Sequence, residues 1–213
     1  MMKELFQVLT IKIINMATKK IEIPKRTIST LLVQIEGISP LIVHQFGEKA
    51  IKMMEEGQAG TAKKDKRRSP QQEYLDSLHL FPDNKTTGFP ATGFKSAIVR
   101  AGKMLDYKMT DLRQTIFVNP DPESGELVKI IGNHSMRTDM VRVANGAVDI
   151  RYRAQYLKWQ ANLEIEYNNN CFGVDAIIQL VREAANVGIG EWRPERNGTM
   201  GRWKVVNAFA KND

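Results

Sequence analysis

The sequence predicts an α+β fold on a split βαβ (ferredoxin-like) plan with insertions. Three observations carry this prediction: an alternating strand near the start, two amphipathic helices, and further strands after each helix. The chain has 213 residues, which is enough for one large domain or two small ones. Its residues are 42% hydrophobic and 26% charged, a composition typical of globular proteins rather than disordered ones.

The first strand is predicted at residues 28–36, where apolar and polar side chains alternate. Helices are expected at 46–56 and around 71–78. The segment between these helices, 57–70, has no apolar periodicity and contains the run KKDKRR. Because neither flank looks complete alone, we interpret this segment as a mobile basic insertion within a single domain of residues 27–213. The basic residues of the insertion are Lys63, Lys64, Lys66, Arg67 and Arg68.

The clearest helix is predicted at 94–105, where apolar residues recur at helical spacing and Thr92 is a suitable N-cap. Residues 115–118 and 127–131 are expected to pair as two strands around the turn NPDPESG. The Arg-rich segment 133–158 is expected to be irregular.

The last part of the chain is again expected to form a strand, a helix and a strand in that order. Residues 160–167 alternate cleanly and predict a strand, and 174–187 have the apolar pattern of a second helix that ends before Gly188. A glycine-rich loop then leads to a last strand at 203–209. The complete order is strand, helix, strands, strand, helix, strand, which is the order of a split βαβ fold.

The net charge of +7 is unevenly distributed along the chain. Residues 1–26 hold six basic and two acidic residues, and residues 58–70 hold five basic residues and one acidic residue, so each segment carries +4. Basic appendages on a near-neutral body are typical of polyanion-binding proteins, so we expect nucleic acid as partner, with solvated tails as the alternative. Within the basic arm of residues 1–26, residues 1–15 are expected to be an upstream extension or a weakly ordered segment.

A loop rich in glycine and proline opens onto the predicted helix at residues 88–95. Helix N-termini bind phosphate well because their first N–H groups are unpaired. Lys95 lies in the first helical turn, where a cation opposes the helix dipole, so it indicates a bound anion there. The alternative is a solvent-exposed lysine. Arg100 and Lys103 lie on the polar face of the same helix and would extend the contact.

A second candidate site is the glycine-rich loop between the last helix and the last strand. Its glycines allow close backbone approach to a ligand or to another chain. Its arginines are forked phosphate donors, and Trp192 offers a surface for a stacked base. The alternative is that the loop only turns the chain, with Trp192 and Trp203 packed inside. The glycines and arginines of this loop are Gly188, Gly190, Gly198, Gly201, Arg193, Arg196 and Arg202.

Arginines and aromatic residues are interleaved between positions 137 and 159, a pattern that suits stacking together with phosphate contact. We expect Arg151 and Arg153 to bind nucleic acid. Tyr156 and Trp159 are expected to be core residues, and the alternative for the arginines is pairing with nearby aspartates.

Motifs for catalysis are sparse. The three histidines have no metal-ligand spacing, and the single cysteine, Cys171, makes neither a disulfide nor a zinc site. The Walker loop and the G-x-S-x-G motif are absent from the sequence. We therefore expect a protein without metal or cofactor that is not an enzyme. One cysteine and no run of about 18 apolar residues favour a cytoplasmic protein with no membrane contact.

Three segments resemble conserved elements of the RAMP superfamily, which includes the backbone subunits of CRISPR effector complexes. Residues 37–41 match "G-x-(S/T)-P-L", and residues 89–97 match the element "(I/F)-P-(A/G)-(S/T)-(S/G)-(L/F)-K-(S/G)-A". The glycine-rich loop at 190–201 precedes the last strand, but it ends G-x-x-G rather than G-x-G. The chain is also similar to small stand-alone relatives of phages and prophages, which share the ending V-G-I-G-E-W-R-P.

The resemblance implies an RNA-recognition-type core that binds single-stranded RNA or DNA along its backbone without sequence preference. It also implies head-to-tail assembly of copies along the strand. Some RAMP endoribonucleases place a general-base histidine near the position of His44, so a metal-independent nuclease that activates a ribose 2′-OH is the first alternative. The second alternative is a structural phage protein that binds a protein partner.

Overall fold

The computed structural model describes residues 27–45, 69–142 and 146–211. The N-terminal arm and the helix expected at 46–56 lie outside the described residues. The basic residues of the run KKDKRR lie outside them as well.

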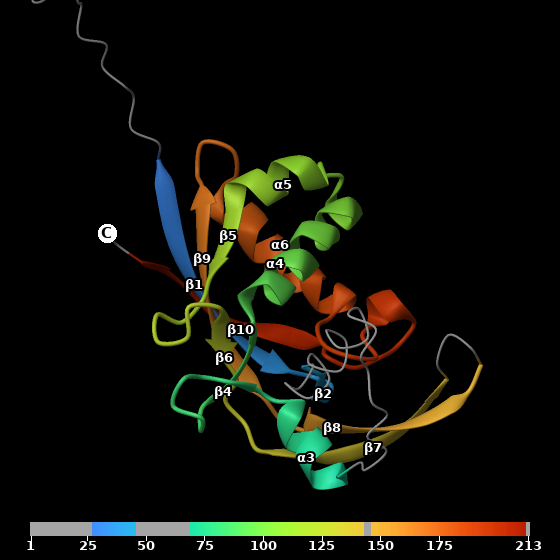
Figure 1. Ribbon diagram of the computed structural model, residues 1–213. Helices are drawn as coiled ribbons and strands as arrows, with labels where there is room; N and C mark the ends of the chain where they lie inside the picture. Colours follow the sequence, from blue (N-terminus) through green and yellow to red (C-terminus); the bar gives the residue numbers. More distant parts are fainter. Residues whose placement is uncertain (1–26, 46–68, 143–145, 212–213) are drawn as a thin grey trace, which may run out of the picture.

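The main sheet has four strands, and every neighbouring pair is antiparallel. Helices α4 (Ala91–Ala101) and α6 (Val174–Val187) cover one side of this sheet (Figure 1). Among the described residues no helix covers the other side, which is called the open face. In order across the sheet, the strands are β10 (Trp203–Lys211), β1 (Ile28–Gly37), β9 (Gln160–Asn168) and β5 (Ile116–Asn119).

The alternation of the two central strands explains why they form and which way they face. Leu31 pairs with Ile165 and Val33 pairs with Leu163, and all four side chains are buried under the helices. The residues between them point to the open side, so a shift by one residue would move the apolar set into water. The α4 helix continues this core because Phe94 is fully buried between the sheet and α6.

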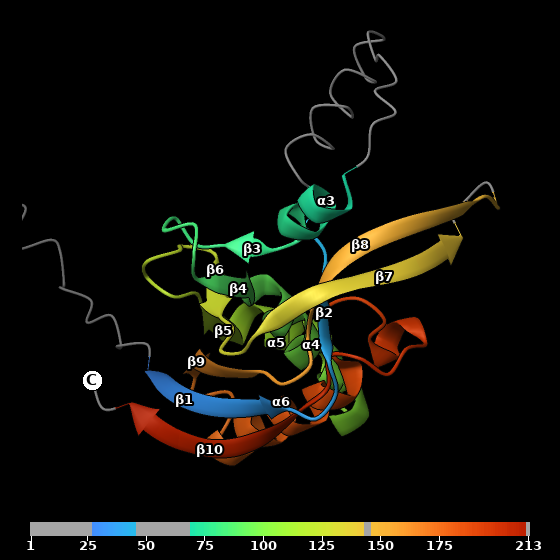
Figure 2. The same ribbon diagram turned by 90° about the horizontal axis from the view of Figure 1, so that it is seen from below.

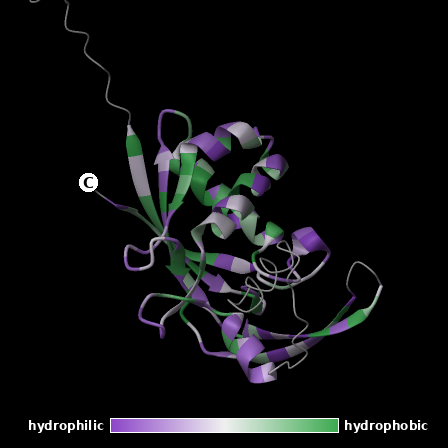
Figure 3. Cartoon of the chain, viewed as in Figure 1, coloured by the Kyte–Doolittle hydropathy of each residue, from purple (hydrophilic) through white to green (hydrophobic). Residues whose placement is uncertain are grey.

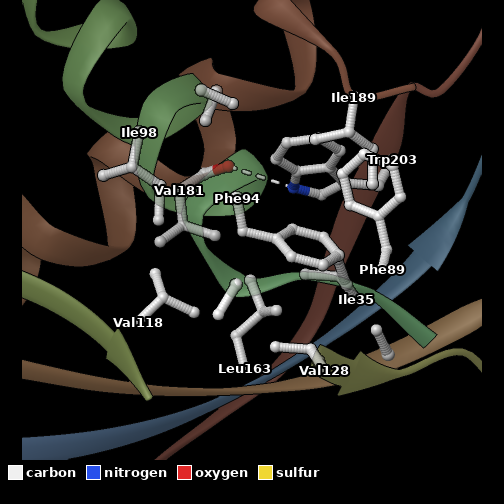
Figure 4. Close-up of a cluster of buried hydrophobic side chains, with 14 of the residues drawn as sticks. Ile35, Phe89, Phe94, Ile98, Val118, Val128, Leu163, Val181, Ile189 and Trp203 are labelled. Atoms are coloured by element: carbon white, nitrogen blue, oxygen red, sulfur yellow. Dashed lines mark hydrogen bonds between the residues drawn. The ribbon is translucent and has the colours of Figure 1, made fainter. Parts of the chain in front are cut away.

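Aliphatic and aromatic side chains together fill the layer between the helices and the sheet (Figure 4). Phe94 contacts Phe89 and Trp203 edge-on, with ring centroids 5.7 Å and 6.2 Å apart. Trp203 Nε1 donates a hydrogen bond of 3.1 Å to the carbonyl of Val181, which satisfies its only polar atom (Figure 4). This contact fixes the start of β10 against α6.

Two smaller three-stranded sheets flank the main one. The first has the order β2 (Leu41–Val43), β8 (Val148–Tyr156) and β7 (His134–Arg142), and the second has the order β3 (His79–Leu80), β4 (Thr87–Pro90) and β6 (Leu127–Lys129). Hairpin β7–β8 projects from the body as a long arm, which is clearest from below (Figure 2). The remaining elements are the helices α3 (Pro70–Asp76) and α5 (Met109–Thr115) and the 3₁₀ turns η1 (Gly102–Leu105) and η2 (Pro194–Arg196).

The expectation of an α+β fold is confirmed, and the paired strands of all three sheets are antiparallel. Three details were wrong. The strands β5 and β6 do not pair with each other, because β5 pairs with β9 and β6 pairs with β4. Residues 133–158 are not irregular: they contain the β7–β8 hairpin, in which β8 alternates Val148, Ile150 and Tyr152 with polar residues. The outer part of the hairpin carries hydrophobic residues (Figure 3), and Met140 and Val148 there are exposed. Helix α4 begins earlier, with Pro90 as N-cap instead of Thr92.

The two aromatic residues expected in the core are buried, since Tyr156 is 0% and Trp159 1% exposed. Trp159 Nε1 donates a hydrogen bond of 2.9 Å to the carbonyl of Ser39. A Cβ at Gly37 would collide with this ring, so the glycine is needed for close packing. Among the helices of the described residues, none is long and apolar enough to span a membrane.

Candidate nucleic-acid interface

The segment 37–43 and the glycine-rich loop, which are distant in sequence, are joined by backbone hydrogen bonds. The N–H of Glu191 donates to the carbonyl of Ile42 at 2.9 Å, and the N–H of Gly201 donates to the carbonyl of Pro40 at 2.7 Å. Ser39 Oγ accepts the N–H of Arg202 at 2.9 Å. Two of the motifs that carry the family resemblance therefore build one layer, with the loop lying on β2.

The glycines of the loop are explained by contacts within the chain. A Cβ at Gly198 would collide with the Trp192 carbonyl, and one at Gly201 with the carbonyl of Ile189. Gly188, Gly190 and Gly201 also have φ between +67° and +74°, a region that disfavours other residues. The glycines thus hold the loop in one compact shape.

The loop and helix α4 border a cavity of about 280 Å³ that is open to solvent on one side. Pro90, Gly93, Ser96 and Arg100 line it from the start of α4 and along one helical face. The glycine-rich loop supplies the opposite wall, from Val187 to Glu191 together with Arg193 and Glu195, and His44, His79, Phe89 and Ala97 complete it. The start of helix α4, the glycine-rich loop and His44, all singled out in the sequence, therefore line one cavity.

Arginines from two elements gather at this cavity around one carboxylate. Arg100 of α4 forms an ion pair with Glu195 Oε1, and Arg193 Nε contacts Glu195 Oε2 at 3.0 Å. Arg193 Nη1 also donates to the carbonyl of Gly190 at 3.0 Å. Burial lowers the pKa of Arg193, and the like charges of Arg196 and Arg100 lower it further. The cluster of Arg100, Arg193 and Arg196 is thus dense enough for its members to repel one another.

Two histidines line the same cavity. Burial lowers the pKa of His79 from 6.5 to about 4, and the charge of His44 adds to the shift. The pKa of His44 is lowered as well, mainly by burial and then by the charge of Arg153. Both imidazoles are therefore neutral at pH 7. In the part of the chain that the structure describes, no group of three histidine, cysteine or acidic residues could hold a metal ion.

The other residues expected at helix α4 face elsewhere. The Lys95 ammonium lies 4.2 Å from the centre of the Phe117 ring on β5, and burial lowers its pKa. Lys95 and Arg100 are five residues apart, so they project from different sides of the helix. Lys103 is exposed on the 3₁₀ turn η1. Of the three basic residues on this segment, only Arg100 reaches the cavity.

Within the loop, Trp192 is 43% exposed and has φ +56°, unusual for a bulky residue. Its carbonyl accepts the N–H of Met200 at 2.9 Å, which holds the backbone there. An exposed indole on the residue that precedes Arg193 in sequence suits base stacking. Arg202 points toward α6, where its Nη2 donates to Asn186 Oδ1 at 3.4 Å.

The hairpin arginines are engaged in ion pairs. Arg153 is buried, with Asp139 at 3.7 Å and Glu191 at 3.9 Å. Arg151 Nε contacts Asp149 at 2.8 Å and remains partly exposed. The pairing that was the alternative reading is therefore present for both residues, and Arg153 connects the hairpin to the glycine-rich loop.

Two acidic residues and one histidine that line the cavity were not predicted as site residues from the sequence. Glu191 and Glu195 alternate with arginines in the run EWRPER, and that spacing was the available signal for internal ion pairs. His79 had no such signal, because it reaches the cavity only through the pairing of β3 with β4.

The comparisons with known proteins concern the fold. No protein-family model matches the chain, and no curated protein matches it either. A chain in the cryo-EM structure of the Type III-B Cmr-beta bound to cognate target RNA has a TM-score of 0.56 and 7% identity. The alignment covers 98% of this protein and 66% of that chain, so this protein spans just under two thirds of its neighbour. Cmr6 from Pyrococcus furiosus, a crystal structure, has a TM-score of 0.42 and 9% identity, with coverage of 84% and 99%. The first likeness shows a shared fold.

Proposed function

We propose that this protein binds single-stranded nucleic acid through its phosphate backbone, at the cavity between helix α4 and the glycine-rich loop. The observation that carries the proposal is the convergence of Arg100 and Arg193 on one carboxylate. Guanidinium groups on a rigid frame bind phosphate oxygens in the same forked manner. The neighbour with a shared fold is described as bound to target RNA, which supports the same class of ligand.

Recognition at this site is expected to be tolerant of sequence. Arginine contacts to phosphate carry no base information. The exposed Trp192, which precedes Arg193 in sequence, would stack on any base, since every base has an aromatic face. The basic residues of the run KKDKRR would add long-range attraction for the same polyanion.

We also propose that the main sheet with α4 and α6 is a split βαβ core. Its strand order β10-β1-β9-β5 supports this assignment. β9 is antiparallel to both β1 and β5, so these two strands are parallel with β9 inserted between them. That insertion is the defining feature of a split βαβ unit.

Assembly of several copies along one strand is part of the proposal. The glycines of the loop are occupied by contacts within the chain, so the support comes from the β7–β8 arm. Met140 and Val148 near its tip are 78% and 64% exposed, and Met136 and Ile150 on the same face are also exposed. An apolar arm of this kind suits a neighbouring copy. Electron microscopy with a strand of about 60 nucleotides should reveal several protomers per strand, and one protomer at saturation would contradict assembly.

A salt titration with a labelled single strand tests the binding proposal. For phosphate recognition, the logarithm of the affinity should fall with the logarithm of salt concentration, at a slope of about −0.7 per phosphate neutralised. A weak salt dependence would contradict backbone recognition and favour the structural alternative with a protein partner. Competition between RNA and DNA of one sequence then tells which strand is preferred.

A second candidate function is metal-independent RNA cleavage. The observation that favours it is that His44 lines the same cavity as Arg100 and Arg193. Its lowered pKa leaves the imidazole neutral and able to accept a proton from a ribose 2′-OH at pH 7. Labelled RNA incubated without metal should remain intact if the protein only binds. Cleavage that disappears in His44→Ala would replace the first proposal by the nuclease.

A further inference from the structure

Glu195 occupies the position that a phosphate of the strand would need. Its Oε1 pairs with Arg100 and its Oε2 lies 3.0 Å from Arg193 Nε, so two oxygens of one anion contact two separate guanidinium groups. Two oxygens of a phosphodiester present the same pattern of acceptors. In the free protein, an internal carboxylate therefore satisfies the two arginines at the cavity.

The backbone around Glu195 is held independently of its side chain. The N–H of Arg196 donates to the Arg193 carbonyl at 2.8 Å, and the N–H of Asn197 donates to the Pro194 carbonyl at 3.0 Å. The N–H of Gly198 donates to the Arg193 carbonyl at 3.0 Å. Rotation of the Glu195 side chain toward solvent would break its two ion pairs and none of these backbone hydrogen bonds. The side chain is already 27% exposed, so it does not need to pass through packed residues.

Resting on the proposed function, we propose that Glu195 is an internal competitor of the strand: it occupies Arg100 and Arg193 in the free protein, and a strand phosphate displaces it. Each ion pair at this exposure is worth little, so one phosphate from a strand anchored elsewhere suffices for displacement. A free nucleoside monophosphate has no second anchor and competes poorly with a carboxylate attached to the same loop. Glu195 thus favours long strands over single nucleotides.

The test compares Glu195→Gln with Glu123→Gln, which makes the same charge change on the exposed turn between β5 and β6. Binding to a labelled strand of about 30 nucleotides is measured at one moderate salt concentration. Loss of two weak ion pairs should make Glu195→Gln bind about fivefold more tightly than wild type. Glu123→Gln should stay within about twofold. Glu195→Ala is the second variant and should shift in the same direction.

A double-mutant cycle separates this role from a general effect of charge. In a chain that already carries Arg100→Gln and Arg193→Gln, the change Glu195→Gln should alter the affinity less than about twofold. Wild-type affinity or weaker binding in Glu195→Gln would overturn the competitor role while leaving salt-dependent binding of wild type as evidence for the proposed function. Absence of binding by wild type and variant alike would overturn both.

Discussion

The open face of the main sheet and the loop side of the molecule both carry basic side chains, but in different arrangements. On the sheet, Lys204 contacts Glu36 on the neighbouring strand at 3.1 Å, and Lys211 Nζ contacts Glu164 on β9 at 2.8 Å. On the loop side, Arg100 and Arg193 share a single carboxylate, and Arg196 is exposed beside them.

The difference is the reason why we propose polyanion binding on the loop side. The sheet face also carries Glu166, so its charged side chains sum to −1 from three glutamates and two lysines. The hydrogen bond from Lys211 lowers the pKa of Glu164 and keeps that carboxylate charged. An RNA-recognition-type core would be expected to use its sheet, yet in this protein the convergent arginines lie at the end of α4 and on the loop.

The largest expected effect concerns the shape of the loop. Gly201→Ala should cost stability twice, because φ is +67° and the new methyl group would meet the Ile189 carbonyl. Gly125→Ala is the matched control, with φ +73° and no neighbouring atom within 4 Å. We expect about 1–2 kcal/mol of destabilisation for the control and roughly 2 kcal/mol more for Gly201→Ala. Urea unfolding measures the free energy of unfolding of both variants. Equal losses would mean that the loop can accommodate a methyl group at Gly201, which would contradict this prediction.

The next largest expected effect is a pH dependence of the stability, caused by His79 in the cavity wall. The pKa of His79 is about 4 in the folded protein and ordinarily 6.5, so folding disfavours its protonated form. Its contribution to stability is complete above pH 6.5 and is lost as the pH falls toward 4. The free energy of unfolding should decrease by about 3 kcal/mol over this range, and His79→Gln should remove that part of the decrease. Identical pH profiles of wild type and variant would contradict the buried neutral imidazole.

The smallest expected effect concerns the sheet face. Phe209 on β10 is 53% exposed and is the kind of side chain on which a base could stack. If the sheet bound bases, Phe209→Ser would cost roughly 1–3 kcal/mol of binding free energy. The loop-side account predicts a change in Kd of less than about twofold in a titration with single-stranded RNA. A tenfold loss would move the binding surface to the sheet.

The sequence patterns predicted the elements whose side chains alternate between a buried and a solvated face. Strand β9 and helix α6 were predicted at nearly their observed bounds, because Leu163 and Leu180 belong to regular apolar repeats. The β7–β8 arm was missed although Val148, Ile150 and Tyr152 alternate with polar residues, because this interleaving was interpreted as a pattern of nucleic-acid contacts. Strand pairing is decided by contacts between residues distant in sequence, so the strand that pairs with β6 could not be predicted from the local pattern.

Some residues of the candidate site were predicted from the sequence, but their contacts were not. Arg193 was identified because it lies within a glycine-rich loop, and Arg100 because it shares a helix with the preceding motif. Which side of α4 faces the loop depends on packing against α6, so the separation of Lys95 from Arg100 required the structure. The same holds for Glu195, whose role depends on contacts with both arginines.

The most direct measurement compares two double variants that each remove two positive charges. Arg100→Gln with Arg193→Gln changes the loop side, and Lys204→Gln with Lys211→Gln changes the sheet face. Kd for a labelled single strand of about 30 nucleotides is measured for both across a range of salt concentrations. The account predicts a loss of about tenfold to a hundredfold and a flatter salt slope for the arginine pair, against less than about threefold for the lysine pair. Equal losses, or a larger loss for the lysine pair, would contradict binding at the loop side.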